Sequence, residues 1–258
     1  MINIQLILFL KNKQMRQVII KIILSIIPIK VKNWIIEENI RRNFEKKYAV
    51  ESFSQEGEDL ILKRIFSEKK HGFFVDIGAH HPFRFSNTYL LYKQGWNGIN
   101  IDAMPNSMEL FHQYRYSDIN LEMGIGDNQG ELDFYVFNET ALNTFDNNLK
   151  DNYLQIGSYE LSSVVKVKTD TLSNILEKYL TDDKKIDFLN IDVEGLDLNV
   201  LKSNNWSKFR PEFVLVEILD IKNMEDLLTN PISTFLSSVG YSIYAKTVNT
   251  VFYRRIKD

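Results

Sequence analysis

Residues 74–103 read FVDIGAHHPFRFSNTYLLYKQGWNGINIDA and hold two short apolar runs on either side of a helical pattern. The first run, which begins one residue before this stretch, is FFVDI at 73–77, and the second is GINID at 98–102. Both are rich in β-branched and aromatic residues, as is typical of buried strands. The residues between them, 86–94, have helical spacing. Strand, helix and strand in this order predict a parallel β–α–β unit.

The same alternation continues along the chain. Further short apolar runs occur at 119–125, 131–137, 163–168, 186–192 and 213–218. Further helical patterns occur at 56–68, 105–115, 170–180, 196–203 and 223–238. Apolar strands that alternate with helices predict an α/β fold with a doubly wound, mostly parallel sheet.

Two segments depart from this pattern. YSIYAK at 241–246 and TVFYRR at 250–255 are separated by three residues and predict an antiparallel hairpin that closes the sheet. Residues 138–160 are polar and have no clear period, so we expect a long loop that acts as a lid or binding loop.

The composition excludes several classes of site. The chain has 258 residues, 44% of them hydrophobic and 25% charged, as in a folded globular protein. It has no cysteine, which excludes disulfides, zinc–thiolate sites, iron–sulfur clusters and thiol nucleophiles. Its net charge of −3 gives no reason to expect a nucleic-acid partner.

The charge is unevenly distributed. Residues 1–36 contain six Lys or Arg and no acid, so 37–258 carry 25 basic and 34 acidic residues, a net charge of −9. The two apolar stretches of the basic segment, 4–10 and 18–29, are shorter than the roughly 20 residues of a spanning helix. No small-residue cleavage site follows them, so a signal peptide fits poorly.

We therefore expect a basic, apolar helical extension over residues 1–48 and one domain over 49–258. Two interpretations of residues 1–36 stay open. One is a helix lying on the anionic inner face of a membrane, which makes the protein peripheral; the other is a helix docked on the domain or on a partner. In either case we expect a cytoplasmic protein. The sequence carries no signal of an oligomeric state.

Carboxylates follow the predicted strands one after another. They are Asp76, Asp102, Asp127, the pair Asp192 and Glu194, and Glu217. Ligands of an open α/β sheet bind beyond the carboxyl ends of its strands. Because like charges gathered at one edge need donors, a cation or a polyhydroxyl ligand, the series predicts a binding site.

The first strand end suggests which ligand binds. Gly78 allows a close approach of the backbone, but His80 and Pro82 replace the later glycines of a pyrophosphate-binding G-x-G-x-x-G turn. Asp102 follows Asp76 by 26 residues, where a carboxylate meets ribose hydroxyls in nucleoside sites. A nucleoside with an amino-acid tail therefore fits better than a dinucleotide.

These segments resemble the FkbM family of S-adenosylmethionine-dependent methyltransferases over roughly residues 50–255. The segments that carry the resemblance are SQEGED at 54–59, residues 74–103, FLNIDVEGLDLNVLKSNNW at 188–206 and PEFVLVE at 211–217. The resemblance implies a Rossmann-like class I methyltransferase fold and O-methylation of a sugar or a related natural product. One departure is Asp102, where the family more often has Glu; either carboxylate can chelate a diol.

The resemblance also implies the roles of the residues that bind the cofactor, S-adenosylmethionine. Asp76, Gly78 and Ala79 would hold its methionine portion and Asp102 its ribose diol. Asp127 would lie at the adenine side, and Gln55 would line the cleft.

Transfer to a hydroxyl also needs a proton acceptor. His80 and His81 are candidates because histidine titrates near neutral pH, and we favour His81. Asp192 and Glu194 are further catalytic candidates. Three roles stay open for these two residues: binding sugar hydroxyls, acting as base, or holding a divalent cation with Glu217.

Arg84, Asn87 and Glu217 are the candidates for contact with the acceptor. We expect an O-methyltransferase that acts on a small-molecule or glycan acceptor, such as a sugar nucleotide or another precursor of a surface polysaccharide. One alternative is a non-catalytic, membrane-tethered binding domain of the same fold. The other is an NAD-dependent oxidoreductase, which the missing glycines after Gly78 disfavour.

Overall fold

A computed structural model describes residues 27–181, 184–219, 221 and 223–256. The chain divides into two compact units, Met1–Glu51 and Ser52–Asp258. The described part of the first unit contains the helix α3 (Ile29–Tyr48), and none of the residues of this helix is buried. Residues 1–26, on which most of the predicted extension falls, lie outside the described residues.

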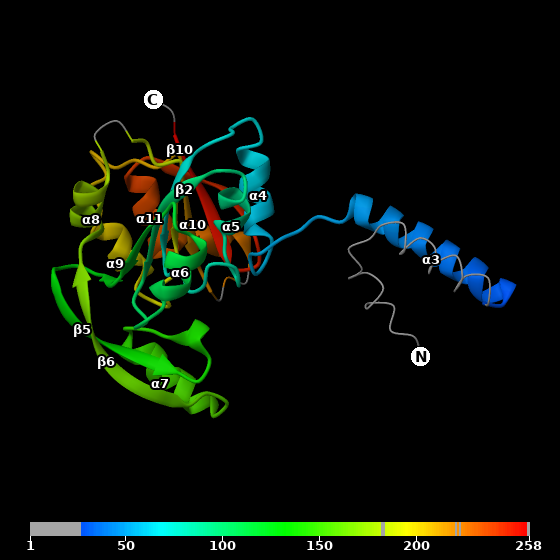
Figure 1. Cartoon of the computed structure of the whole chain (residues 1–258). Helices are drawn as coiled ribbons and strands as arrows, with labels where there is room; N and C mark the ends of the chain where they lie inside the picture. Colours follow the sequence, from blue (N-terminus) through cyan, green and yellow to red (C-terminus); the bar gives the residue numbers. More distant parts are fainter. Residues whose placement is uncertain (1–26, 182–183, 220, 222, 257–258) are drawn as a thin grey trace. The chain divides into compact units, whose positions relative to one another are not determined.

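The second unit is built on a seven-stranded sheet (Figure 1). Its strands lie in the order β3 (Ile119–Glu122), β2 (Asn97–Asp102), β1 (Phe73–Ile77), β7 (Phe188–Ile191), β8 (Phe213–Glu217), β10 (Thr250–Arg255) and β9 (Tyr241–Lys246). The first five strands are parallel, and β10 pairs antiparallel with both β8 and β9. The chain runs outward from β1 to β3 and then restarts at β7, which confirms the predicted doubly wound sheet and its terminal hairpin.

Alternate residues of the strands face two layers of helices. Phe74 and its neighbours on one face pack against α4 (Glu58–Ile65) and α5 (Tyr89–Tyr92). Val75 and its neighbours on the other face pack against α8 (Leu172–Tyr179), α9 (Asp197–Lys202), α10 (Met224–Thr229) and α11 (Pro231–Ser238). Figure 1 shows α8 and α9 across the sheet from α4 and α5. The strands read as continuous apolar runs because both faces are covered.

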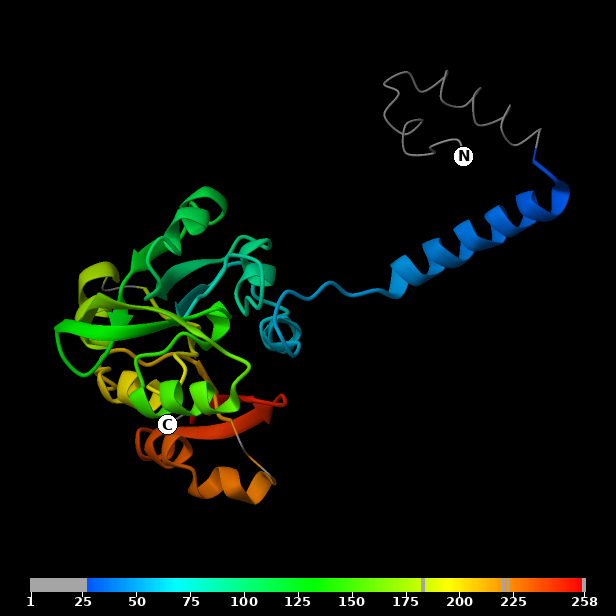
Figure 2. The same cartoon turned by 90° about the horizontal axis from the view of Figure 1, so that it is seen from below.

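The third predicted strand ends earlier than expected. The main sheet keeps only β3, up to Glu122, and the next residues form β4 (Gly124–Ile125) in a separate sheet. That sheet has the order β4, β6 (Leu161–Asp170) and β5 (Gly130–Phe137), so two more predicted strands belong to it. Figures 1 and 2 show β5 and β6 as a long hairpin that extends beyond the main sheet.

Residues 138–160 are more ordered than their polar sequence predicts. They form a 3-10 turn, η1 (Thr140–Leu142), and the helix α7 (Asn147–Ile156). Asp146 caps the start of α7 by accepting hydrogen bonds from the amides of Asn148 and Leu149, and Gly157 ends it with φ of 76°. The cap and the terminal glycine were the available signals of this helix. We call residues 124–170, which hold the second sheet and α7, the insertion.

Candidate active site

A cavity of about 800 Å³ lies at the carboxyl ends of β1, β2, β7 and β8, where the two halves of the sheet diverge. The insertion supplies part of its lining. Four non-glycine residues in the described part of the chain have positive φ, and all four line this cavity: His80, Phe85, Asn106 and Glu194. Strained backbone of this kind concentrates at functional sites.

Gly78 forms the turn after β1 and has φ of 81°. A Cβ at this position would lie 1.7 Å from the backbone oxygen of Asp192. The glycine therefore lets β1 and β7 approach each other, and it exposes the backbone of residues 78 and 79 to the cavity. Ala79 also lines the cavity and packs against Met108 and Phe111.

Asp76 is buried, with 3% of its surface exposed, and lines the cavity from β1. Its Oδ1 accepts a 2.9 Å hydrogen bond from Asn190, its cross-strand neighbour on β7. Its Oδ2 accepts a 3.1 Å bond from Thr88, whose hydroxyl oxygen in turn accepts one from the buried Arg115. Burial raises the pKa of Asp76, while Asn190 and Arg115 lower it. These neighbours hold the carboxylate in one orientation.

Asp102, the last residue of β2, is oriented by backbone amides. Its Oδ2 accepts from the amide of His80 and its Oδ1 from the amide of Met104, each at 2.8 Å. Each carboxylate oxygen keeps a second lone pair for a ligand. Burial raises the pKa of Asp102.

Gln55 lines the cavity, whereas Asp127 does not. The carboxylate of Asp127 accepts a 2.8 Å hydrogen bond from Asn199 on α9. The strand end expected at Asp127 lies five residues earlier, because the chain leaves the main sheet after Glu122. Apolar side chains, among them Met104, Ile125 and Phe134, line the cavity in this region.

His80 and His81 both line the cavity, but one ring nitrogen of each has a protein partner. Nδ1 of His81 accepts the backbone amides of Phe83 and Arg84 at 3.1 and 3.0 Å, so the hydrogen of the neutral ring is on Nε2. Nε2 of His80 lies 3.3 Å from the Arg84 guanidinium. Burial and Arg84 lower the pKa of both histidines. This geometry gives His81 a turn-capping role and disfavours it as the proton acceptor.

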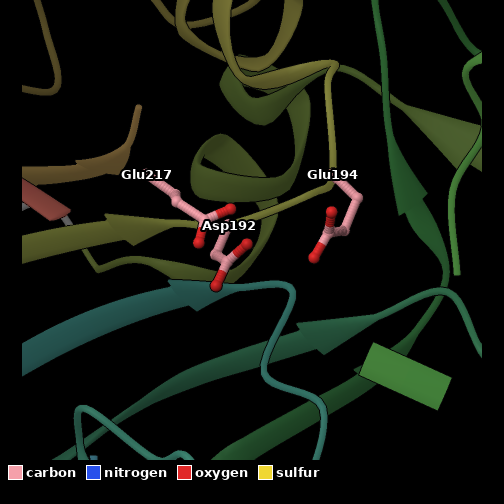
Figure 3. A group of neighbouring side chains, drawn as sticks. All are labelled: Asp192, Glu194 and Glu217. Carbon is pink, nitrogen blue, oxygen red and sulfur yellow. The ribbon is translucent and has the colours of Figure 1, made fainter. Parts of the chain in front are cut away.

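Asp192, Glu194 and Glu217 come together at the ends of β7 and β8 (Figure 3). One carboxylate oxygen from each lies within 4.8 Å of the others. Figure 3 shows Asp192 and Glu217 side by side, with the carboxylate of Glu194 turned toward the same space. This set of three is named the carboxylate cluster below.

Burial and mutual repulsion raise the pKa of each member of the carboxylate cluster. The pKa of Glu194 is raised to about 8, first by burial and then by Asp192. Burial and Glu217 raise the pKa of Asp192 well above its ordinary range, and burial and Glu194 raise that of Glu217. A carboxylate with a pKa near 8 can exchange a proton at neutral pH, and a divalent cation would instead hold all three ionised.

The insertion holds Glu194 from two sides. The hydroxyl of Tyr153, on α7, donates a 2.9 Å hydrogen bond to Oε2 of Glu194. The hydroxyl of Thr144 donates a 2.6 Å hydrogen bond to the backbone oxygen of Glu194. Segment 138–160, expected to act as a binding loop, therefore lies on the cavity and contacts a candidate catalytic residue.

The three residues expected to contact the acceptor all line the cavity. Glu217 belongs to the carboxylate cluster, and Asn87 donates a 3.0 Å hydrogen bond to Asn190. Arg84 forms a 3.4 Å ion pair with Glu139 of the insertion, and both side chains are nearly half exposed. Arg84 is the sole Lys or Arg among the lining residues, all of which belong to the described ranges.

Sequence reasoning missed Asn190, Thr88 and Tyr153 as site residues. Asn190 had a signal, because it is a polar residue within the buried run FLNI. It lies two residues after Phe188, so both side chains face the same side of the sheet, the side that Asp76 also faces. Tyr153 had none, because its approach to Glu194 depends on how the insertion folds.

Comparison with known proteins gives one family. Residues 76–243, more than half of the chain, match the family described as the methyltransferase FkbM domain. No functionally curated protein matches the sequence significantly. Among solved structures, a candidate RNA methyltransferase from Pyrococcus horikoshii aligns with a TM-score of 0.41 and 9% identity, covering 78% of this chain and 84% of its own.

Proposed function

Because the chain belongs to the FkbM methyltransferase family, we propose that it transfers the methyl group of S-adenosylmethionine to a sugar hydroxyl. The acceptor is a glycan, a sugar nucleotide or a related precursor of a surface polysaccharide. One observation carries the proposal: a single cavity holds both kinds of group that the reaction needs. Asp76 and Asp102, at the ends of β1 and β2, are oriented to bind a nucleoside with an amino-acid tail, and the carboxylate cluster lies at the ends of β7 and β8.

The residues at β1 and β2 fit the cofactor. Asp76, held by Asn190 and Thr88, would accept the ammonium of the methionine portion. Asp102 would accept the two ribose hydroxyls, and the side-chain-free turn at Gly78 would leave room for the cofactor against the backbone. The apolar lining around Met104, Ile125 and Phe134 would take the adenine, in place of Asp127, which the family resemblance implied for that position.

Methyl transfer requires two things of the protein: it must position the acceptor, and it must accept one proton. S-adenosylmethionine supplies a methyl group already activated on a sulfonium. The protein must orient the acceptor oxygen and remove its hydrogen, and positioning alone supplies much of the rate. Glu194 is proposed as the proton acceptor, since its pKa is raised to about 8 and Tyr153 holds its carboxylate in place.

Asp192 and Glu217 would bind the neighbouring hydroxyls of the sugar. A divalent cation held by the carboxylate cluster is a second way to orient the same oxygens, and the convergence of three carboxylates is the observation that supports this alternative. Arg84 would meet an anionic group of the acceptor, such as the phosphate of a sugar nucleotide.

Calorimetric titration of S-adenosylhomocysteine into the full-length protein tests the cofactor. We expect micromolar binding that Asp102→Ala abolishes and that NADH does not reproduce. No binding to folded protein would overturn the methyltransferase proposal, and binding of NADH alone would favour an oxidoreductase. Mass spectrometry of a panel of sugar nucleotides and glycans then tests the acceptor. A folded protein that binds the cofactor and methylates no hydroxyl in the panel would favour the non-catalytic alternative.

A further inference from the structure

The first 48 residues differ in charge from the rest of the chain; we call them the amino-terminal segment. The segment contains ten Lys or Arg and three acids, a net charge of +7. Residues 49–258 contain 21 basic and 31 acidic residues, a net charge of −10. The segment is also strongly apolar, since 22 of its first 36 residues are Ile, Leu, Val, Met, Phe or Trp.

The described helix of this segment, α3, exposes large apolar side chains. Ile36, Ile40, Phe44 and Tyr48 follow one another at intervals of four residues and so form a row along the helix. Each is at least 46% exposed, and the rings of Phe44 and Tyr48 are in contact at 5.8 Å. Trp34 is 62% exposed. Apolar side chains in such a row usually mark a binding surface.

The acidic residues of α3 do not offset its positive charge. Glu38 accepts hydrogen bonds from Arg41 at 2.6 Å and from Arg42 at 2.9 Å. Six basic residues and three acidic ones leave α3 with a net charge of +3. The helix thus combines an exposed apolar row with excess cations.

We propose that the amino-terminal segment binds the protein to the surface of an anionic lipid bilayer. Apolar side chains would enter the boundary between headgroups and acyl chains, and the lysines and arginines would meet lipid phosphates. Trp34 and Tyr48 suit this boundary because their rings have an apolar body and a polar edge. No helix in the described part of the chain is long and apolar enough to cross a membrane.

The charge of the segment disfavours pairing with the same segment of a second copy. Pairing two copies of the segment would bring a net charge of +7 against another +7. An anionic bilayer attracts the segment and repels the acidic remainder of the chain, which leaves the remainder in water.

Flotation of the full-length protein with lipid vesicles tests the proposal. We expect binding to phosphatidylcholine vesicles that contain phosphatidylglycerol, and much weaker binding to phosphatidylcholine alone. High salt should weaken the binding because it screens the cations. The assay needs no cofactor or acceptor, so its outcome is independent of the methyltransferase proposal.

Two double variants separate the contributions. Phe44→Ala with Tyr48→Ala removes the end of the apolar row and preserves the helix, because alanine has the highest helix propensity. We expect this variant to bind both kinds of vesicle more weakly than the wild type. Lys30→Gln with Lys32→Gln should lower affinity for the anionic vesicles by about fivefold for each cation removed. Tyr116→Ala, which removes an 81% exposed ring elsewhere in the chain, is the control and should bind as wild type.

Three outcomes would overturn the proposal. One is a folded full-length protein that does not float with anionic vesicles. Another is a stable dimer, measured by light scattering without lipid, that Phe44→Ala with Tyr48→Ala dissociates. The third is a lower melting temperature of the methyltransferase domain in that variant with flotation unchanged, which would mean that the segment docks on the domain.

Discussion

Tyr153 donates a 2.9 Å hydrogen bond to the carboxylate of Glu194 and so joins α7 to the end of β7. Thr144 fixes the backbone oxygen of the same glutamate at 2.6 Å, and Glu194 has a strained φ of 51°. The insertion forms a sheet of its own, yet its side chains hold the proposed catalytic group, Glu194, in position. We expect changes in the insertion to alter catalysis and acceptor choice more than cofactor binding.

Tyr153→Phe tests this relationship. The hydrogen bond from Tyr153 lowers the pKa of Glu194, so its loss should raise that pKa further. The ionised fraction of Glu194 then falls at neutral pH, and the acidic limb of the kcat profile moves to higher pH. We expect kcat at pH 7 to fall by about tenfold, with the affinity for S-adenosylhomocysteine unchanged.

Tyr159→Phe is the matched control, because Tyr159 contacts the ring of Tyr153 and does not line the cavity. A pH profile of Tyr153→Phe that coincides with that of wild type would assign the proton to another group.

Thr88→Val tests how Asp76 is held. The substitution keeps the shape of the side chain and removes the hydroxyl that links Asp76 to Arg115. A hydrogen bond to a charged group contributes about 1.5–3 kcal/mol, so calorimetry should show S-adenosylhomocysteine binding weakened by at least tenfold. Thr169→Val, also buried and outside the cavity, should leave the affinity unchanged. Equal affinities in the two variants would mean that Thr88 is not needed to position Asp76.

Gly78→Ala and Gly157→Ala form a matched pair. Both glycines have positive φ, 81° and 76°, so both alanines carry a backbone cost of about 1–2 kcal/mol. At Gly157 nothing lies within 4 Å of the new Cβ, whereas at Gly78 it would lie 1.7 Å from the Asp192 oxygen. Urea unfolding should therefore show a loss at Gly78 at least about 2 kcal/mol larger than at Gly157. Equal losses would mean that the β1 turn can move away from β7 without cost.

The parts of the fold predicted from the sequence are those fixed by local patterns. The run 73–77, with Asp76 near its end, could be predicted because a buried parallel strand has a continuous apolar run. The separate sheet was missed, because the runs that form β5 and β6 look like main-sheet strands and their partners are chosen by tertiary packing.

The roles of the two histidines show the same limit. Two histidines after a strand suggest a base, but the sequence does not reveal which atoms accept backbone amides. In the structure His81 caps its own turn, and Arg84 lies against the ring nitrogen of His80. The raised pKa of Glu194 likewise follows from burial beside Asp192, which depends on the folded cavity.

The carboxylate cluster should make the stability of the protein depend on pH. The pKa of Glu194 is raised from 4.5 to about 8, so between these values the folded protein keeps a proton that the unfolded chain has released. The free energy of unfolding should therefore fall as pH rises through this window. Asp192 and Glu217 act in the same direction, because their pKa values are also raised. Thermal melts should show a lower melting temperature at pH 8 than at pH 5, and Glu194→Gln should reduce the difference, unlike Glu225→Gln on the exposed side of α10.

A divalent cation should reverse the loss of stability at high pH. The three carboxylates repel one another once they are ionised, and a bound cation would offset that repulsion. We expect Mg²⁺ or Mn²⁺ to raise the melting temperature at pH 8 in the wild type and to have no effect in Glu217→Gln. If neither ion changes the melting temperature at pH 8, the cluster does not bind a divalent cation, and proton uptake alone relieves the repulsion. The carboxylates would then contact the acceptor directly, and chelators would leave the methylation rate unchanged.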